Sequence, residues 1–277
     1  MTTDKRARQK ANRASRVAAA ESAAAKERIR SRITTYAVGA ALVVLAIVGV
    51  AILTSDDDSE TVDPGITAPT TTFEAPPEPG VSAPPLGGSI DGPTPCPTAE
   101  GADERITSFA ETPPMCLDEA VDYSAVLDTS LGSITIELDA ENAPLTVNNF
   151  VVLSRYGFYE GAPFHRIIPD FVIQAGDAVG PNLGQGNPGY AVEDELPEAG
   201  AYEIGSVAMA NSGVDTNGSQ FFVVTGPQGV ALPPNFSLFG TVVEGMDVVT
   251  AIEQSETTTG NAPVDNIVIN SVTILEG

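Results

Sequence analysis

The chain has 277 residues, which is enough for one or two ordinary domains, and its formal net charge is −24. Ten of the 13 Lys and Arg residues precede residue 33, whereas 34 of the 37 Asp and Glu residues follow it. We therefore expect a basic tail and an acidic globular part, and the acidic part argues against binding to DNA or RNA.

The basic tail, residues 1–32, leads into 21 residues without a charge, Ile33 to Leu53. That length spans a bilayer as a helix, and basic residues before it with acidic residues after it predict a cytoplasmic N-terminus and an extracytoplasmic C-terminus. The charged flanks argue against a buried core helix, and the long basic region argues against a cleaved signal peptide. We expect a single-pass cell-membrane protein that contacts lipid through this anchor. The tail either lies against anionic headgroups or only sets the topology.

Residues 54–95 contain nine prolines, a run of threonines and few large apolar side chains. Such a composition cannot bury enough surface to fold and predicts a disordered linker. As a flexible coil the linker would span on the order of 35–40 Å, so it is expected to be a tether that crosses a layer outside the membrane.

Cys96 and Cys116 are the two cysteines of the chain. Because both follow the anchor, on the expected oxidising side, we predict a disulfide that closes the segment 96–117, with two unpaired thiols as the alternative. The chain has one histidine and too few soft ligands for a zinc tetrahedron, so no metal and no cofactor are expected.

The folded domain is predicted over residues 118–277. Alternating apolar residues on both sides of Asp128–Gly132 predict a hairpin. Pro144 and Gly157 bracket an apolar pattern with helical spacing, which predicts a helix. Further short apolar runs begin at Phe171, Ser206, Gln220 and Phe239, a second helix is expected around Val248–Ile252, and a closing strand over Asn266–Leu275. Many short strands with two helices favour an antiparallel barrel.

Three segments of this domain carry a recognisable pattern: FHRIIPDFVIQAGD at residues 164–177, MANSGVDTNGSQFF at 209–222 and LPPNFSLFG at 232–240. In composition, order and spacing they closely resemble the signature blocks of the cyclophilin family, and the similarity extends over about residues 120–277. The resemblance implies a mainly β fold, an eight-stranded antiparallel closed barrel capped by two helices. It also implies a peptidyl-prolyl cis-trans isomerase that acts on proline-containing polypeptides. A monomer is expected, and the short loops and single anchor favour a bacterial source.

Isomerisation of a prolyl bond needs neither a nucleophile nor a metal. The barrier of ~18–20 kcal/mol comes from delocalisation of the nitrogen lone pair into the carbonyl, so a catalyst must bind the twisted amide better than either planar form. A donor aimed at the prolyl nitrogen does this, and Arg166 in the first block is the matching donor by resemblance. The alternative role of Arg166 is a structural ion pair.

The resemblance also assigns the remaining site residues. The proline ring would contact Phe171, Val172, Phe222, Leu232 and Phe236, the substrate backbone would contact Ala210, Asn211 and Gln220, and Gln174 would orient Arg166 or the substrate carbonyl. Judged without the resemblance, each apolar member is more often plain core. His165, the sole histidine, is expected to be structural.

Two departures from the family pattern concern the rim of the site. The chain has no tryptophan, and Ala231 stands where many members carry one; Phe236 stands where many have a histidine. Neither position supplies the donor, so activity should survive, but cyclosporin affinity should fall.

Three functions compete at this point: an isomerase for exported proteins, a non-catalytic prolyl-peptide binding module or holdase, and a structural envelope protein. The presence of Arg166 together with Gln174, Asn211 and Phe222 favours the isomerase.

Overall fold

The computed structural model describes residues 80–180 and 182–277. None of the helices in these two ranges is both long enough and apolar enough to cross a membrane. The basic tail, the predicted membrane segment 33–53 and the first part of the predicted linker lie outside the described residues, so they stay predictions.

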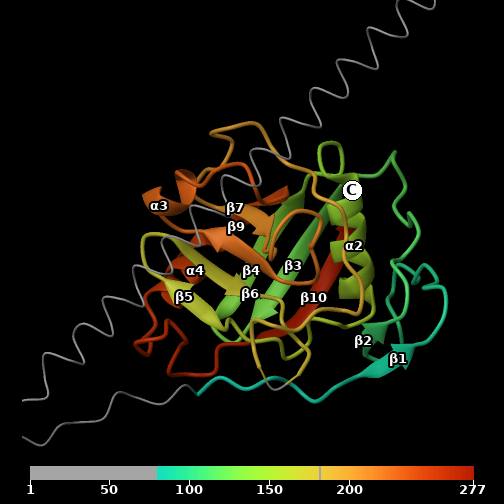
Figure 1. Cartoon of the computed structure of the whole chain (residues 1–277), viewed down its shortest axis with the longest axis horizontal. Coiled ribbons are helices and arrows are strands. Elements are labelled where there is room, and N and C mark those ends of the chain that lie inside the picture. The colour runs from blue at the N-terminus through green and yellow to red at the C-terminus, as the bar shows by residue number, and fades with distance from the viewer. Residues whose placement is uncertain (1–79, 181) are drawn as a thin grey trace, which may run out of the picture. The chain divides into compact units, whose positions relative to one another are not determined.

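The centre of the described structure is one eight-stranded sheet in which every neighbouring pair is antiparallel (Figure 1). In spatial order its strands are β10 (Ile269–Glu276), β3 (Tyr123–Thr129), β4 (Gly132–Leu138), β9 (Leu238–Glu244), β7 (Ser206–Met209), β8 (Phe221–Val224), β6 (Val172–Ala175) and β5 (Arg166–Ile168). Within the described ranges no ladder joins the edge strands β5 and β10, which approach through the isolated bridge between Pro163 and Val268. The prediction of eight antiparallel strands is confirmed. They form a half-barrel, and the expected closed barrel is not seen in the described residues.

The predicted hairpin and helices form where the sequence indicates. Thr129 pairs with Gly132 across the turn between β3 and β4, and this glycine has a φ of 134°, which favours a residue without a side chain. Helix α2 (Pro144–Arg155) starts at its proline and is followed by Gly157 at φ 65°. Helix α4 (Met246–Glu253) is the second predicted helix, and the short α3 (Pro227–Val230) was not anticipated. α2 packs against β10, and α4 packs against β4, β5 and β6.

Strands β7 and β8 are buried on both faces, and an apolar cluster lies on each side of them. On β8, Phe221 and Val223 join the main core with α2, whereas Phe222 and Val224 join a smaller cluster on the opposite face. This follows from the two-residue period of a strand, which directs successive side chains to opposite faces. The smaller cluster, called the outer cluster below, is where the candidate site lies.

A lead-in segment, residues 80–122, precedes the sheet and packs against it. Its strands β1 (Gly88–Ile90) and β2 (Ile106–Phe109) pair in parallel beside α2 (Figure 1). A disulfide joins Cys96 to Cys116, as predicted. The linker was expected to extend to residue 95, but residues 80–95 include β1, and Gly80 N–H donates to Val264 O. Composition alone did not reveal these backbone partners, because they lie far away in the sequence.

Candidate active site

A row of directly opposed residues crosses five strands of the sheet. Arg166 on β5 pairs with Gln174 on β6, and Gln174 pairs with Phe222 on β8. The row continues through Ala208 on β7 to Leu238 on β9. Since opposed residues in an antiparallel pair share a face, this register places the guanidinium and the amide of Gln174 beside the outer cluster.

The outer cluster contains all five residues assigned to the proline ring. Its buried members are Val172, Tyr202, Ala208, Phe222 and Val224, and its partly exposed members are Phe171, Ala210, Val230, Leu232, Phe236 and Leu238. The rings of Phe222 and Phe236 meet edge to face, with centroids 5.3 Å apart. A buried apolar floor with exposed apolar edges is suited to an uncharged ring such as proline.

Arg166 is held by a chain of side-chain amides. Its Nη1 donates to Oε1 of Gln174 at 3.2 Å, Nε2 of Gln174 donates to Oε1 of Gln220 at 3.0 Å, and Nε2 of Gln220 donates to the carbonyl of Gly186 at 3.0 Å. The guanidinium carbon lies 5.9 Å from the ring centroid of Phe171. Within residues 80–180 and 182–277 there is one ion pair, between Arg155 and Glu276. Arg166 therefore has no carboxylate partner among these residues. This argues against the structural ion pair that the sequence left open.

The residues assigned to the substrate backbone line a separate cavity of about 480 Å³, called the second pocket below. Gln174, Ala210, Asn211 and Gln220 contribute to it, together with residues 184–187, 189–191 and the loop before β8. Nδ2 of Asn211 donates to the carbonyl of Asn235 at 2.8 Å, next to Phe236. The predicted catalytic, ring-binding and backbone-binding residues therefore lie together: Gln174 lines the second pocket and accepts a hydrogen bond from Arg166, whose guanidinium lies over Phe171 of the outer cluster.

Sequence reasoning missed two polar residues that shape this site. Tyr202 is 1% exposed, and its hydroxyl donates to the carbonyl of Phe236 at 2.7 Å. Asp177 is fully buried and accepts backbone N–H groups from Val179, Gly184 and Gly186, which shapes one wall of the second pocket. The aromatic residue in the polar stretch before β7 was a signal for Tyr202, but its partner lies 34 residues away.

The imidazole of His165 lies next to Gly184, where an added Cβ atom would be 3.5 Å from the ring. Burial lowers the pKa of its imidazole below the usual value, and this effect outweighs the nearby Asp177 carboxylate, which favours the charged form. The folded state therefore retains the neutral ring at a pH at which the unfolded chain takes up a proton.

We expect His165 to make stability depend on pH. Its contribution is complete above the unfolded pKa of about 6.5 and is lost as the pH falls toward the lower folded value. Thermal unfolding of the parent and of His165→Gln at about pH 7.5 and about pH 5 should show a smaller difference between the two pH values in the variant. An equal difference in both proteins would show that the unfavourable protonation lies elsewhere.

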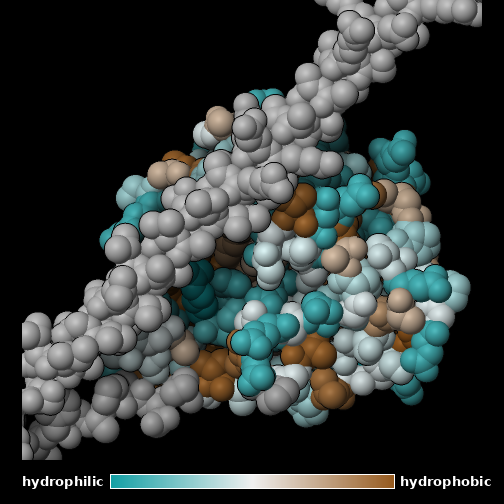
Figure 2. Space-filling view, in the orientation of Figure 1, coloured by the Kyte–Doolittle hydropathy of each residue, from teal (hydrophilic) through white to brown (hydrophobic). Residues whose placement is uncertain are grey.

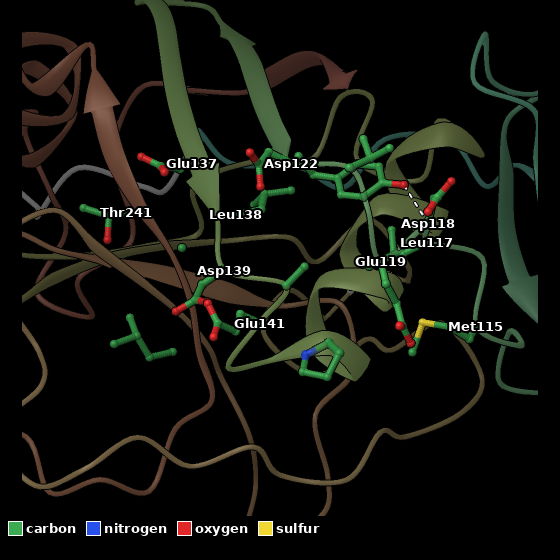
Figure 3. A pocket seen from close by; sticks show the side chains of 16 residues that line it. Met115, Leu117, Asp118, Glu119, Asp122, Glu137, Leu138, Asp139, Glu141 and Thr241 are labelled. Atoms are coloured by element: carbon green, nitrogen blue, oxygen red, sulfur yellow. Dashed lines mark hydrogen bonds between the residues drawn. The ribbon is translucent and has the colours of Figure 1, made fainter. Parts of the chain in front are cut away.

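A larger cavity, of about 830 Å³, lies between residues 115–123, the end of β4 and the start of β9 (Figure 3). Lys, Arg and His are absent from its lining. Six carboxylates line it: Asp118, Glu119, Asp122, Glu137, Asp139 and Glu141. It shares Leu238 with the outer cluster but contains none of the predicted site residues. On the coloured part of the face seen in Figure 2, hydrophilic residues surround small hydrophobic groups.

Comparison with known proteins agrees with this geometry. The family model described as cyclophilin type peptidyl-prolyl cis-trans isomerase/CLD matches residues 125–274. The human "Peptidyl-prolyl cis-trans isomerase-like 1" is 44% identical over 145 residues, covering 52% of this chain and 87% of the relative. "Peptidyl-prolyl cis-trans isomerase CYP18-2" of Arabidopsis thaliana is 37% identical over 152 residues, covering 54% of this chain and 92% of the relative.

A crystal structure of a cyclophilin type peptidyl-prolyl cis-trans isomerase from Cryptosporidium parvum is similar in fold. It has a TM-score of 0.51 and 28% identity, over 56% of this chain and 99% of that chain. A second structure of the same protein was determined in the presence of the dipeptide Ala-Pro. Because the family model covers more than half of this chain, from β3 into β10, the chain belongs to the family of cyclophilin-type peptidyl-prolyl cis-trans isomerases.

Proposed function

We propose that this member of the family isomerises X-Pro bonds in exported proteins, with Arg166 as the group that stabilises the twisted amide. The observation that carries the proposal is a guanidinium without a carboxylate partner among the described residues. Gln174 holds it at the edge of an apolar cluster. A charged donor that is not neutralised by a neighbouring acid remains available to the substrate.

The expected chemistry is differential binding. In the planar amide the lone pair of the prolyl nitrogen is delocalised and accepts no hydrogen bond, whereas in the twisted amide it does. A donor at that nitrogen therefore stabilises the transition state more than either ground state. An acceleration of about 10⁵ requires about 7 kcal/mol of such differential stabilisation.

The substrate is proposed to lie across both parts of the site. The proline ring would rest on Phe222 and its neighbours in the outer cluster, which excludes water from the twisting bond. The preceding residues would extend toward Asn211 and Gln220 in the second pocket. The Ala-Pro dipeptide named for the Cryptosporidium protein supports this class of ligand.

A coupled assay on a prolyl tetrapeptide tests this function. The full-length chain should accelerate the slow cis-to-trans phase of the peptide, and the added rate should increase in proportion to the concentration of the chain. If the peptide binds without any acceleration, the chain is a binding module and the proposal is wrong.

The location outside the cytoplasm rests on the charge asymmetry around residues 33–53 and on the disulfide between Cys96 and Cys116. A bacterial cell envelope is the setting we propose. Protease added to intact spheroplasts should remove the domain and leave the basic tail protected. Full protection of the domain would contradict this topology.

We also expect weak inhibition by cyclosporin. Ala231 is exposed at the end of α3, where it precedes Leu232 of the outer cluster. A tryptophan there would add a large apolar surface beside the ligand. Ala231→Trp should therefore strengthen cyclosporin binding, measured by titration, while leaving isomerisation of a short peptide largely unchanged. Unchanged affinity would show that position 231 does not correspond to the tryptophan of other members.

A further inference from the structure

One residue of the lead-in segment, Phe109, contacts a loop that lines the second pocket. Phe109, at the end of β2, lies outside the residues that the family model matches and is 2% exposed. It contacts the loop Gly184–Tyr190, called the pocket loop below, whose residues form one wall of the second pocket.

Phe109 contacts the pocket loop through both its backbone and its ring. Its N–H donates to the carbonyl of Pro188 at 2.8 Å. At Gly189, with φ 113°, an added Cβ atom would overlap the carbonyl oxygen of Phe109, so the two backbones are in close contact. The ring of Phe109 meets that of Tyr190 edge to face at 6.1 Å, and the Tyr190 hydroxyl donates to Oδ1 of Asn149 at 2.7 Å. These contacts hold residues 188–190, the C-terminal part of the pocket loop, of which Gly189 and Tyr190 line the second pocket.

Gly186, two residues before Pro188 in the same loop, holds the amide chain of the candidate site. The carbonyl of Gly186 accepts from Gln220, Gln220 accepts from Gln174, and Gln174 accepts from Arg166. Each amide can present either its oxygen or its nitrogen to its neighbour. The Gly186 carbonyl accepts only, so it requires the nitrogen of Gln220 to face it and thereby leaves the oxygen of Gln174 for Arg166.

The lead-in has other attachments that do not involve the pocket loop. Ile106 N–H donates to the carbonyl of Tyr156, and the Arg105 guanidinium donates to the carbonyls of Gly157 and Phe158. The disulfide between Cys96 and Cys116 closes the segment around them. Because these attachments keep the lead-in in place, the contact of Phe109 with the pocket loop can be tested on its own.

We propose that Phe109 is a positioning residue for isomerisation: it holds the pocket loop so that Gly186 sets the amide chain that orients Arg166. The proposal rests on the function proposed above for Arg166. It assigns to a segment outside the family domain a part in how substrate residues before the proline are bound.

The test compares Phe109→Ala with Ile106→Ala in the full-length chain. Both substitutions shorten a side chain of β2 that packs on the main core, but Phe109→Ala also removes the ring that meets Tyr190 of the pocket loop, while its backbone hydrogen bond to Pro188 remains. For each variant we would measure hydrogen exchange at residues 184–190. We would also measure kcat and KM for two prolyl peptides, one with and one without residues before the X-Pro pair.

In Phe109→Ala, amides of the pocket loop should exchange faster, and kcat/KM for the longer peptide should fall about tenfold, because small displacements of a positioned group have large kinetic effects. The shorter peptide should be affected less, Phe109→Leu should recover part of the loss, and Ile106→Ala should show neither change despite lower thermal stability. Unchanged exchange at 184–190, or equal losses in both alanine variants, would overturn the proposal. An inactive parent would instead refute the proposed function, and the exchange comparison would still decide whether Phe109 holds the loop.

Discussion

Arg166→Ala is expected to lower the rate of prolyl isomerisation on the order of 10²–10³-fold, the usual cost of removing a preorganised electrostatic donor. The thermal unfolding temperature should change little, because Arg166 is only partly buried and forms no ion pair with any residue in 80–180 or 182–277. Arg166→Lys should also be poor, since an ammonium lacks the planar fork that can donate to Gln174 and to the substrate together.

The matched control for this prediction is the same substitution at Arg155. Arg155 is 9% exposed and pairs with Glu276, so Arg155→Ala should lower stability while leaving the isomerisation rate of the folded protein near that of the parent. The measurement is the rate on a prolyl peptide together with thermal unfolding of the same sample. Parental activity in Arg166→Ala would refute the mechanism, and a loss explained by unfolding would make Arg166 a structural residue.

Phe222→Ala is expected to weaken both substrate binding and stability. Phe222 is 4% exposed, is opposed by Gln174 and Ala208, and supports the ring of Phe236. Removing a buried phenylalanine costs about 3–5 kcal/mol of unfolding free energy, and here it also removes the floor proposed for the proline ring. KM for a prolyl peptide should therefore rise as the unfolding temperature falls.

Its neighbour Phe221 provides the control, because it occupies the same strand but faces the main core. Phe221→Ala should destabilise the fold by a similar amount and leave KM close to the parental value. Denaturant unfolding and steady-state kinetics of both variants separate the two effects. Equal changes in KM would mean that the outer cluster does not receive the proline ring.

Local sequence patterns predicted the elements whose signals lie within a few residues. The hairpin between β3 and β4 follows from alternation around one turn, and α2 follows from Pro144, Gly157 and helical spacing. The resemblance to known signature blocks supplied the candidate site residues, whose roles stay predictions, and the strand register brings three of them together, Arg166, Gln174 and Phe222. Alternation alone could not say which face of β8 would be the core and which the site, because both faces are buried.

The features that were missed depend on partners far away in the sequence. The order of residues 80–95 comes from backbone contacts such as Gly80 with Val264, which a proline-rich composition does not reveal. The role of Tyr202 depends on Phe236, and that of Phe109 on Pro188 and Tyr190. The closed barrel was expected from the resemblance, whereas β5 and β10 form no ladder with each other in the part of the chain that the structure describes.

Exchange between the cis and trans forms of a prolyl peptide, observed directly by two-dimensional NMR, tests most directly whether Arg166 stabilises the twisted amide. The parent protein should accelerate exchange without changing the cis and trans populations. Arg166→Ala should bind the same peptide with similar affinity and give little exchange, because the donor is used in the transition state and not in either planar form. Equal exchange in the parent and in Arg166→Ala at matched occupancy would contradict the account.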